Sequence, residues 1–122
     1  MAGHPDAADL VDAVRGFLVA VESRLSGREA FHAKVAGNVL AIVERELRQQ
    51  PERVERAALA RLLGHDGEPA ALRAGLCAAL RDGRLDAKTP GLLDALTEAT
   101  LARLAVDNPN FSTFRRLKET PP

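Results

Sequence analysis

The first side chain that could bind a ligand is an amide in the middle of a hydrophobic stripe. Apolar residues recur at helical spacing between residues 28 and 50, and on a wheel of 100° per residue Asn38 lies within about 20° of Phe31. A buried amide without a hydrogen-bond partner costs roughly 1–3 kcal/mol. Asn38 is therefore either a core residue bonded to a neighbouring helix or a trapped water, or a donor that faces a ligand between helices.

Charged side chains beside that stripe could complete a pocket. Glu46 lies one turn beyond Ile42, Arg45 flanks the other side, and Arg24 borders the stripe of the preceding helix. An intramolecular Glu–Arg bridge at the edge of a bundle is the simpler explanation for these charges. With Asn38 and His32 they form the predicted ligand-binding set, and no residue is predicted to be catalytic.

A histidine has the spacing of a metal ligand. Glu29 and His32 match the Glu-x-x-His motif of di-iron helical bundles, but such a centre needs a second motif and two further glutamates. Neither His4 nor His65 follows a glutamate at that spacing. We therefore expect no metal and no cofactor. Phosphate-binding glycine loops and hydrolase signatures are also missing, so the sequence leans away from an enzyme.

The elements that must position these residues are helices. The chain is 46% apolar but holds four Phe and no Trp or Tyr, so Leu, Val and Ala must fill the core. Ala, Leu, Arg and Glu favour helix over strand. The apolar spacing predicts about five helices, with a final helical turn near residues 111–117 that could fold back onto them. The five cover approximately residues 7–25, 28–50, 51–63, 69–81 and 90–106.

The first two predicted helices should form a long antiparallel pair, because Ser26 and Gly27 leave only a short break between them. We expect an all-α fold in which residues 1–118 make one compact bundle of about five helices. A loose tail, residues 119–122, should follow it.

Charge and hydropathy exclude several classes of partner. Lys and Arg number 17, and so do Asp and Glu, without a long basic block, so no nucleic-acid partner is expected. No apolar run approaches the roughly 18–20 residues that cross a bilayer, so no membrane partner is expected. With no visible secretory leader and a single Cys, we expect a cytoplasmic protein.

Three stretches together carry a family resemblance. They are PDAADL leading into AVRGFL (residues 5–18), FHAKVAGNVL (31–40) and LARLAVDNP (101–109). The chain resembles a family of small bacterial proteins of unassigned function, found beside or fused to aminoglycoside-phosphotransferase-like kinases and acyl-CoA dehydrogenases. The resemblance implies an accessory role and gives no residue a catalytic task. It also draws attention to Arg15, which lies about 140° from Leu10 and could serve a second interface.

Two functional hypotheses remain open. The first is a helical accessory or interaction protein that binds an acyl-CoA dehydrogenase, a kinase-like enzyme or a second copy of itself. Its predicted interface residues are Arg15 and an apolar patch of Leu59, Leu62 and Leu63. The alternative is a small-molecule-binding protein or small enzyme with a pocket between helices around Asn38 and His32.

Overall fold

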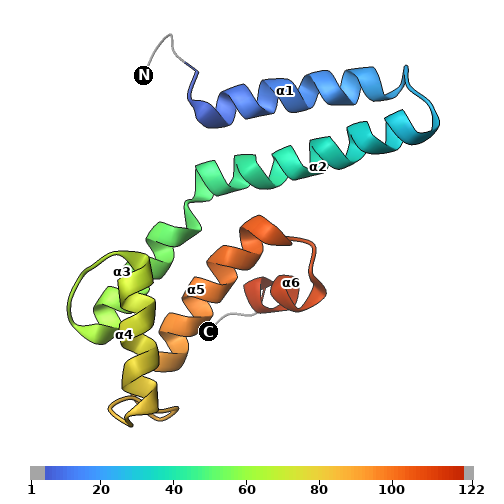
Figure 1. Ribbon diagram of the computed structural model, residues 1–122. Coiled ribbons are helices and arrows are strands. Elements are labelled where there is room, and N and C mark those ends of the chain that lie inside the picture. Colours follow the sequence, from blue (N-terminus) through green and yellow to red (C-terminus); the bar gives the residue numbers. More distant parts are fainter. Residues whose placement is uncertain (1–4, 120–122) are drawn as a thin grey trace. The chain divides into compact units, whose positions relative to one another are not determined.

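All of the secondary structure that the computed structural model describes, over residues 5–119, is helical (Figure 1). The all-α prediction is confirmed, but this part of the chain holds six helices where about five were expected. The final turn predicted near residue 111 is a helix of eight residues, which includes Glu119. Residues 120–122 of the predicted tail lie outside the described residues. The helices are α1 (Ala7–Glu22), α2 (Gly27–Gln49), α3 (Pro51–Leu63), α4 (Pro69–Arg81), α5 (Leu92–Asp107) and α6 (Ser112–Glu119).

The described residues divide into two compact units, 5–49 and 50–119. The first holds α1 and α2, and the second holds α3 to α6. The single bundle expected for residues 1–118 stays a prediction.

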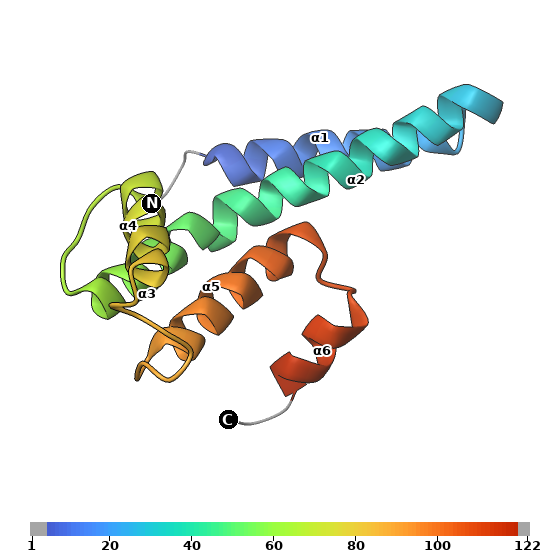
Figure 2. The ribbon, with the colours of Figure 1, turned by 60° about the horizontal axis from the view of Figure 1, so that its bottom comes forward.

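The first unit is an antiparallel helical hairpin, as the sequence predicts, with α1 and α2 side by side in both views (Figures 1 and 2). A reciprocal cap starts α1, because the Asp9 N–H donates to the Asp6 carboxylate at 2.8 Å and the Asp6 N–H donates to Asp9 at 3.2 Å. Helix α1 ends at Glu22 rather than Leu25. The Arg24 N–H already bonds the Val21 carbonyl at 2.8 Å, which tightens the chain into a turn.

The boundary between the units is set by two residues. Gln50 has φ +48°, the one positive φ of a non-glycine residue among the described residues, and Pro51 opens α3 as predicted. The proline ring disfavours right-handed helical geometry at the residue before it. Helix α2 therefore ends at Gln49 and α3 starts afresh.

The second unit is built around four leucines. Leu59, Leu72, Leu76 and Leu92 are buried together where α3 packs against α4 and α5. Helix α6 contacts α5 and buries Phe114. Helix α5 begins at Leu92 rather than at the predicted Pro90, because Gly91, with φ +88°, turns the chain into it.

Candidate docking surfaces

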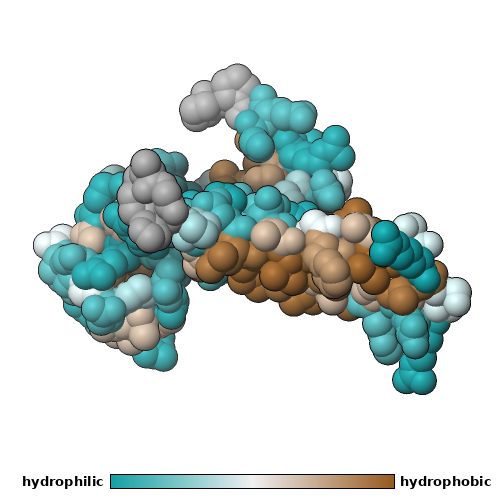
Figure 3. Space-filling model, turned by 90° about the horizontal axis from the view of Figure 1, so that it is seen from above, coloured by the Kyte–Doolittle hydropathy of each residue, from teal (hydrophilic) through white to brown (hydrophobic). Residues whose placement is uncertain are grey.

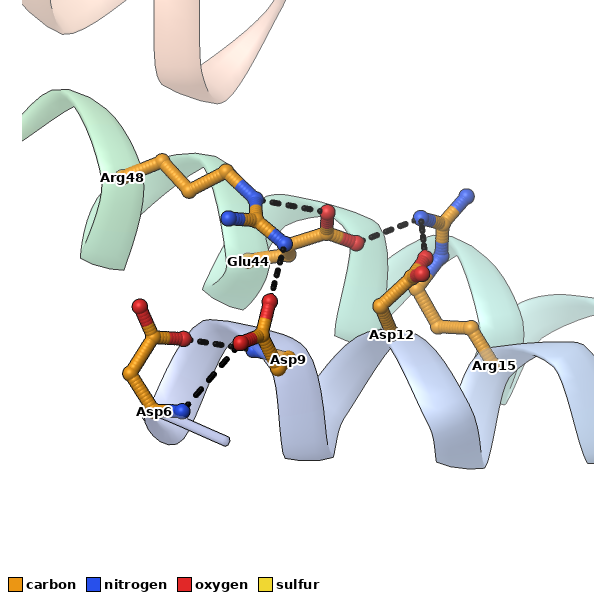
Figure 4. Close-up of polar contacts among 6 residues, drawn as sticks. All are labelled: Asp6, Asp9, Asp12, Arg15, Glu44 and Arg48. Carbon is orange, nitrogen blue, oxygen red and sulfur yellow. Dashed lines mark hydrogen bonds and ion pairs between the residues drawn. The ribbon is translucent and has the colours of Figure 1, made fainter. Parts of the chain in front are cut away.

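One side of the α1–α2 hairpin is held by an ion-pair network (Figure 4). The Arg15 guanidinium lies 2.6 Å from one Glu44 carboxylate oxygen, and Arg48 Nε lies 3.0 Å from the other. A second Arg48 nitrogen is 3.3 Å from Asp9, and Arg15 also reaches Asp12 at 3.5 Å. Arg15, a predicted interface residue, is thus engaged inside the hairpin.

The same ion pairs fix the register of the two helices. In an antiparallel pair, residues at the same height along the two helices have a nearly constant sum of residue numbers. Arg15 pairs with Glu44, which gives a sum of 59, and Asp9 pairs with Arg48, which gives 57. By this rule Val14 is level with Val43, since their numbers also sum to 57. The network therefore aligns the apolar residues of the hairpin as well as its charges.

The network favours the charged form of Glu44 and of Asp9. Hydrogen bonds from Arg48 and then from Arg15 hold the pKa of Glu44 below its usual value. The backbone N–H of Asp6, followed by the Arg48 side chain, lowers the pKa of Asp9. Because each carboxylate is already paired with a cation, the network is suited to holding the hairpin together rather than to proton transfer.

Each helix of the hairpin also exposes a row of apolar side chains, on another side than the ion-pair network. Figure 3 shows hydrophobic surface along the hairpin. On the wheel Val14 lies roughly 160° from Asp12 of the network. We call the six residues of these rows the hairpin face, and their exposed fractions run from 38% to 66%. The hairpin face consists of Leu10, Val14 and Phe17 on α1 and Val39, Val43 and Leu47 on α2.

The second unit has an apolar groove along α5. The groove has a volume of about 200 Å³, and its lining includes a leucine from α6. Leu93 is 61% exposed here and Leu117 is 50% exposed, whereas Leu92, about 100° around α5 from Leu93, is buried in the core. Helix α5 is thus apolar on two sides, of which only one packs against α3. The groove is lined by Leu93, Leu96, Thr97, Thr100, Leu101, Leu104 and Leu117.

A cleft of about 360 Å³ adjoins this groove, where α3, α4 and α5 meet. The two share Leu96, Thr100 and Leu104, and the charged side chains of the cleft are Glu52, Glu55, Arg73 and Arg103. The Arg73 guanidinium is 2.5 Å from Glu55, and Arg103 Nε is 3.1 Å from Asp107. A ligand in the cleft would compete with these ion pairs. The charges therefore form a polar border to the apolar groove.

The residues predicted to bind a ligand do not surround a pocket described here. Asn38 and His32 are exposed on α2, and the His32 ring lies 6.0 Å from that of Phe31. Arg24 is exposed in the turn after α1, while Arg45 and Glu46 are half-buried on α2. A pocket around Asn38 and His32 stays a prediction.

The predicted interface leucines of α3 belong to the second unit's own core. Leu59 is 2% exposed, and Leu62 and Leu63 pack against the cluster that contains it. Leu62 and Leu63 are partly buried there, and a role for the three leucines in an interface stays a prediction.

Sequence reasoning missed the groove along α5. The apolar spacing predicts the helix but does not separate its core side from a second apolar side that holds Leu93 and Leu101. A signal was present, because the five leucines of α5 span about 180° of the wheel, which is wider than one core-facing stripe. Leu117 carried a second signal, since its spacing from Phe111 and Phe114 indicated a further amphipathic turn.

Two kinds of site are missing from residues 5–119. No three His, Cys, Asp or Glu side chains there gather in a way that could hold a metal ion. None of the helices in this range combines the length and the apolar composition needed to cross a bilayer.

Residues 23–111 match a family described as a domain of unknown function, DUF6285. The match covers more than half of the chain and runs from the turn after α1 to the residue before α6. No curated protein and no solved structure matches the chain.

Proposed function

This chain belongs to the DUF6285 family, and we propose that it is an accessory protein that binds a larger enzyme through the groove along α5. The observation that carries the proposal is the exposure of Leu93 and Leu117 in the apolar groove along α5. A row of leucines between helices is the kind of surface that accepts the apolar side of a partner's amphipathic helix.

The surroundings of the groove support a protein partner over a small ligand. Charged residues of α3, α4 and α5 border its apolar centre, and protein interfaces have the same arrangement of an apolar core and a polar rim. The groove itself, at about 200 Å³, is below the roughly 300–1,000 Å³ of most small-molecule sites. The adjoining cleft of about 360 Å³ is within that range, but a small ligand there would compete with the Glu55–Arg73 ion pair.

The partner that we propose is an acyl-CoA dehydrogenase or an aminoglycoside-phosphotransferase-like kinase, in the cytoplasm. The resemblance of residues 5–18, 31–40 and 101–109 to proteins found beside such enzymes supports this choice. The free, exposed thiol of Cys77 suits a reducing compartment.

Binding of the purified chain to each enzyme from the same organism tests the proposal. We expect one enzyme to bind, and we expect Leu93→Lys to abolish binding because a charge would enter the apolar groove. The matched control is Leu80→Lys on α4, which is also exposed but lies outside the groove, and which should bind normally. Failure of the unmodified chain to bind either enzyme, or equal loss in both variants, would refute the proposal.

A further inference from the structure

The hairpin face offers a second interaction surface, separate from the groove along α5. We propose that it pairs with the hairpin face of a second copy of this chain, so that two α1–α2 hairpins form a four-helix bundle. The two-helix hairpin has one apolar side to bury, and two such hairpins bury each other in the simplest bundle architecture.

The exposed area is of the size that a dimer needs. The six side chains of the hairpin face are on average about half exposed, so at roughly 150–200 Å² each they expose on the order of 500 Å². Two copies would bury on the order of 1,000 Å² from these side chains alone, which reaches the lower bound for a specific interface. Neighbouring residues such as Val21, which is half-buried, would add to this area.

The spacing of the apolar residues fits helical partners on more than one side. In α1 the residues Val11, Val14, Leu18 and Val21 follow one another at intervals of three, four and three. In α2, Ala36, Leu40, Val43 and Leu47 do the same at intervals of four, three and four. This is the seam of helices that pack by knobs into holes, the geometry of four-helix bundles.

The register set by the ion pairs makes the hairpin face self-complementary. Val14 is level with Val43, and Leu10 is level with Leu47, because both pairs sum to 57. A two-fold axis parallel to the helices would place α1 of one copy opposite α2 of the other. Because such an axis leaves the height of every residue unchanged, each layer of the bundle would contain two side chains from α1 and two from α2.

The charges of the two helices favour this arrangement. Helix α1 carries Asp9, Asp12 and Glu22 against Arg15, a net charge of −2, whereas α2 carries four Lys or Arg against three Glu, a net charge of +1. The hairpin face itself contains no charged residue. In this arrangement a helix of net charge −2 would lie opposite one of net charge +1 across an apolar centre.

The mass of the chain in solution tests the proposal. By light scattering over a dilution series we expect twice the 13.1 kDa of one chain. Val14→Glu and Val43→Lys should each give monomers, because each places two like charges in one apolar layer. Val19→Glu is the matched control, since Val19 is also exposed on α1 (65% against 51% for Val14) but lies roughly 140° from Val14 on the wheel, and it should remain dimeric.

A mixture of two variants separates loss of pairing from loss of folding. Equal amounts of Val14→Glu and Val43→Lys should re-form dimers, because Glu on α1 would then face Lys on the other copy's α2. A monomeric unmodified chain would overturn the proposal by showing that a second copy does not cover the hairpin face. Dimers that persist in Val14→Glu, or a mixture that stays monomeric, would overturn it as well.

Discussion

Truncating Leu72 should remove a large part of the stability of the second unit. Leu72 is 1% exposed and lies in the cluster with Leu59, Leu76 and Leu92. Leu72→Ala deletes the buried methyl groups and leaves a cavity, which costs about 3–4 kcal/mol at a well-packed site. For a unit of this size that loss corresponds to a drop of roughly 12–32 °C in melting temperature.

The assay is urea unfolding followed by far-ultraviolet circular dichroism. Leu80→Ala is the matched control, because it makes the same chemical change on the same helix at a position that is 40% exposed. It should cost less than about 1 kcal/mol. If the two variants lost equal stability, the assignment of the core to Leu72 and its neighbours would be refuted.

Hydrogen exchange on the same variant tests the division into two units. Amides of α3, α4 and α5 should lose protection in Leu72→Ala, whereas amides of α1 and α2 should keep theirs. Equal loss of protection in all five helices would show that the chain unfolds as one unit. That result would support the single bundle predicted for residues 1–118.

Three further predictions concern the ion-pair network, the boundary residue and the small-molecule alternative. The pKa values of Asp9 and Glu44 lie below their ordinary values in the folded chain, so the contribution of these carboxylates to stability is complete above about pH 4 and is lost as the pH falls through the lower folded-state values. The melting temperatures at pH 7 and pH 3 should therefore differ less in Glu44→Gln than in the unmodified chain. An unchanged difference would contradict the role of the network. Gln50→Val should cost about 1–2 kcal/mol because a β-branched side chain is strained at positive φ, whereas Gln50→Gly should be neutral or slightly stabilising in the same melting assay. Acyl-CoAs and phosphorylated metabolites should leave the melting temperature of the chain unchanged. A ligand that did bind, at 100 times its dissociation constant, would add about 2.7 kcal/mol to the free energy of unfolding. If Asn38→Ala abolished such a gain, the result would favour the small-molecule pocket around Asn38 instead.

The helices could be predicted from the sequence because caps, prolines and apolar spacing act within a few residues. Pro51 opens α3 as predicted, and Asp6 caps α1, since a cap needs only a side chain within reach of its own backbone. The prediction failed where a turn competed with the apolar spacing. The three residues after Glu22 keep the spacing of a helix, but their backbone bonds close a turn.

The surfaces depended on contacts that periodicity does not contain. The spacing of Leu59 and that of Leu93 indicate equally that each lies on an apolar helix side, yet the first is buried and the second is exposed. Which apolar side is covered depends on where the other helices lie. In the same way, Arg15 could be placed away from the main stripe, but its pairing with Glu44 required the register of the hairpin.

The register of the ion pairs between α1 and α2 limits which insertions and deletions the hairpin can tolerate. Because Asp9 lies against Arg48 and Arg15 against Glu44, deleting one residue from either helix would turn every later position by about 100° and shift it by 1.5 Å. Insertions and deletions in this arm should therefore occur as matched changes of seven residues on both sides of the turn. Relatives whose first helix is longer or shorter should carry the compensating change in their second.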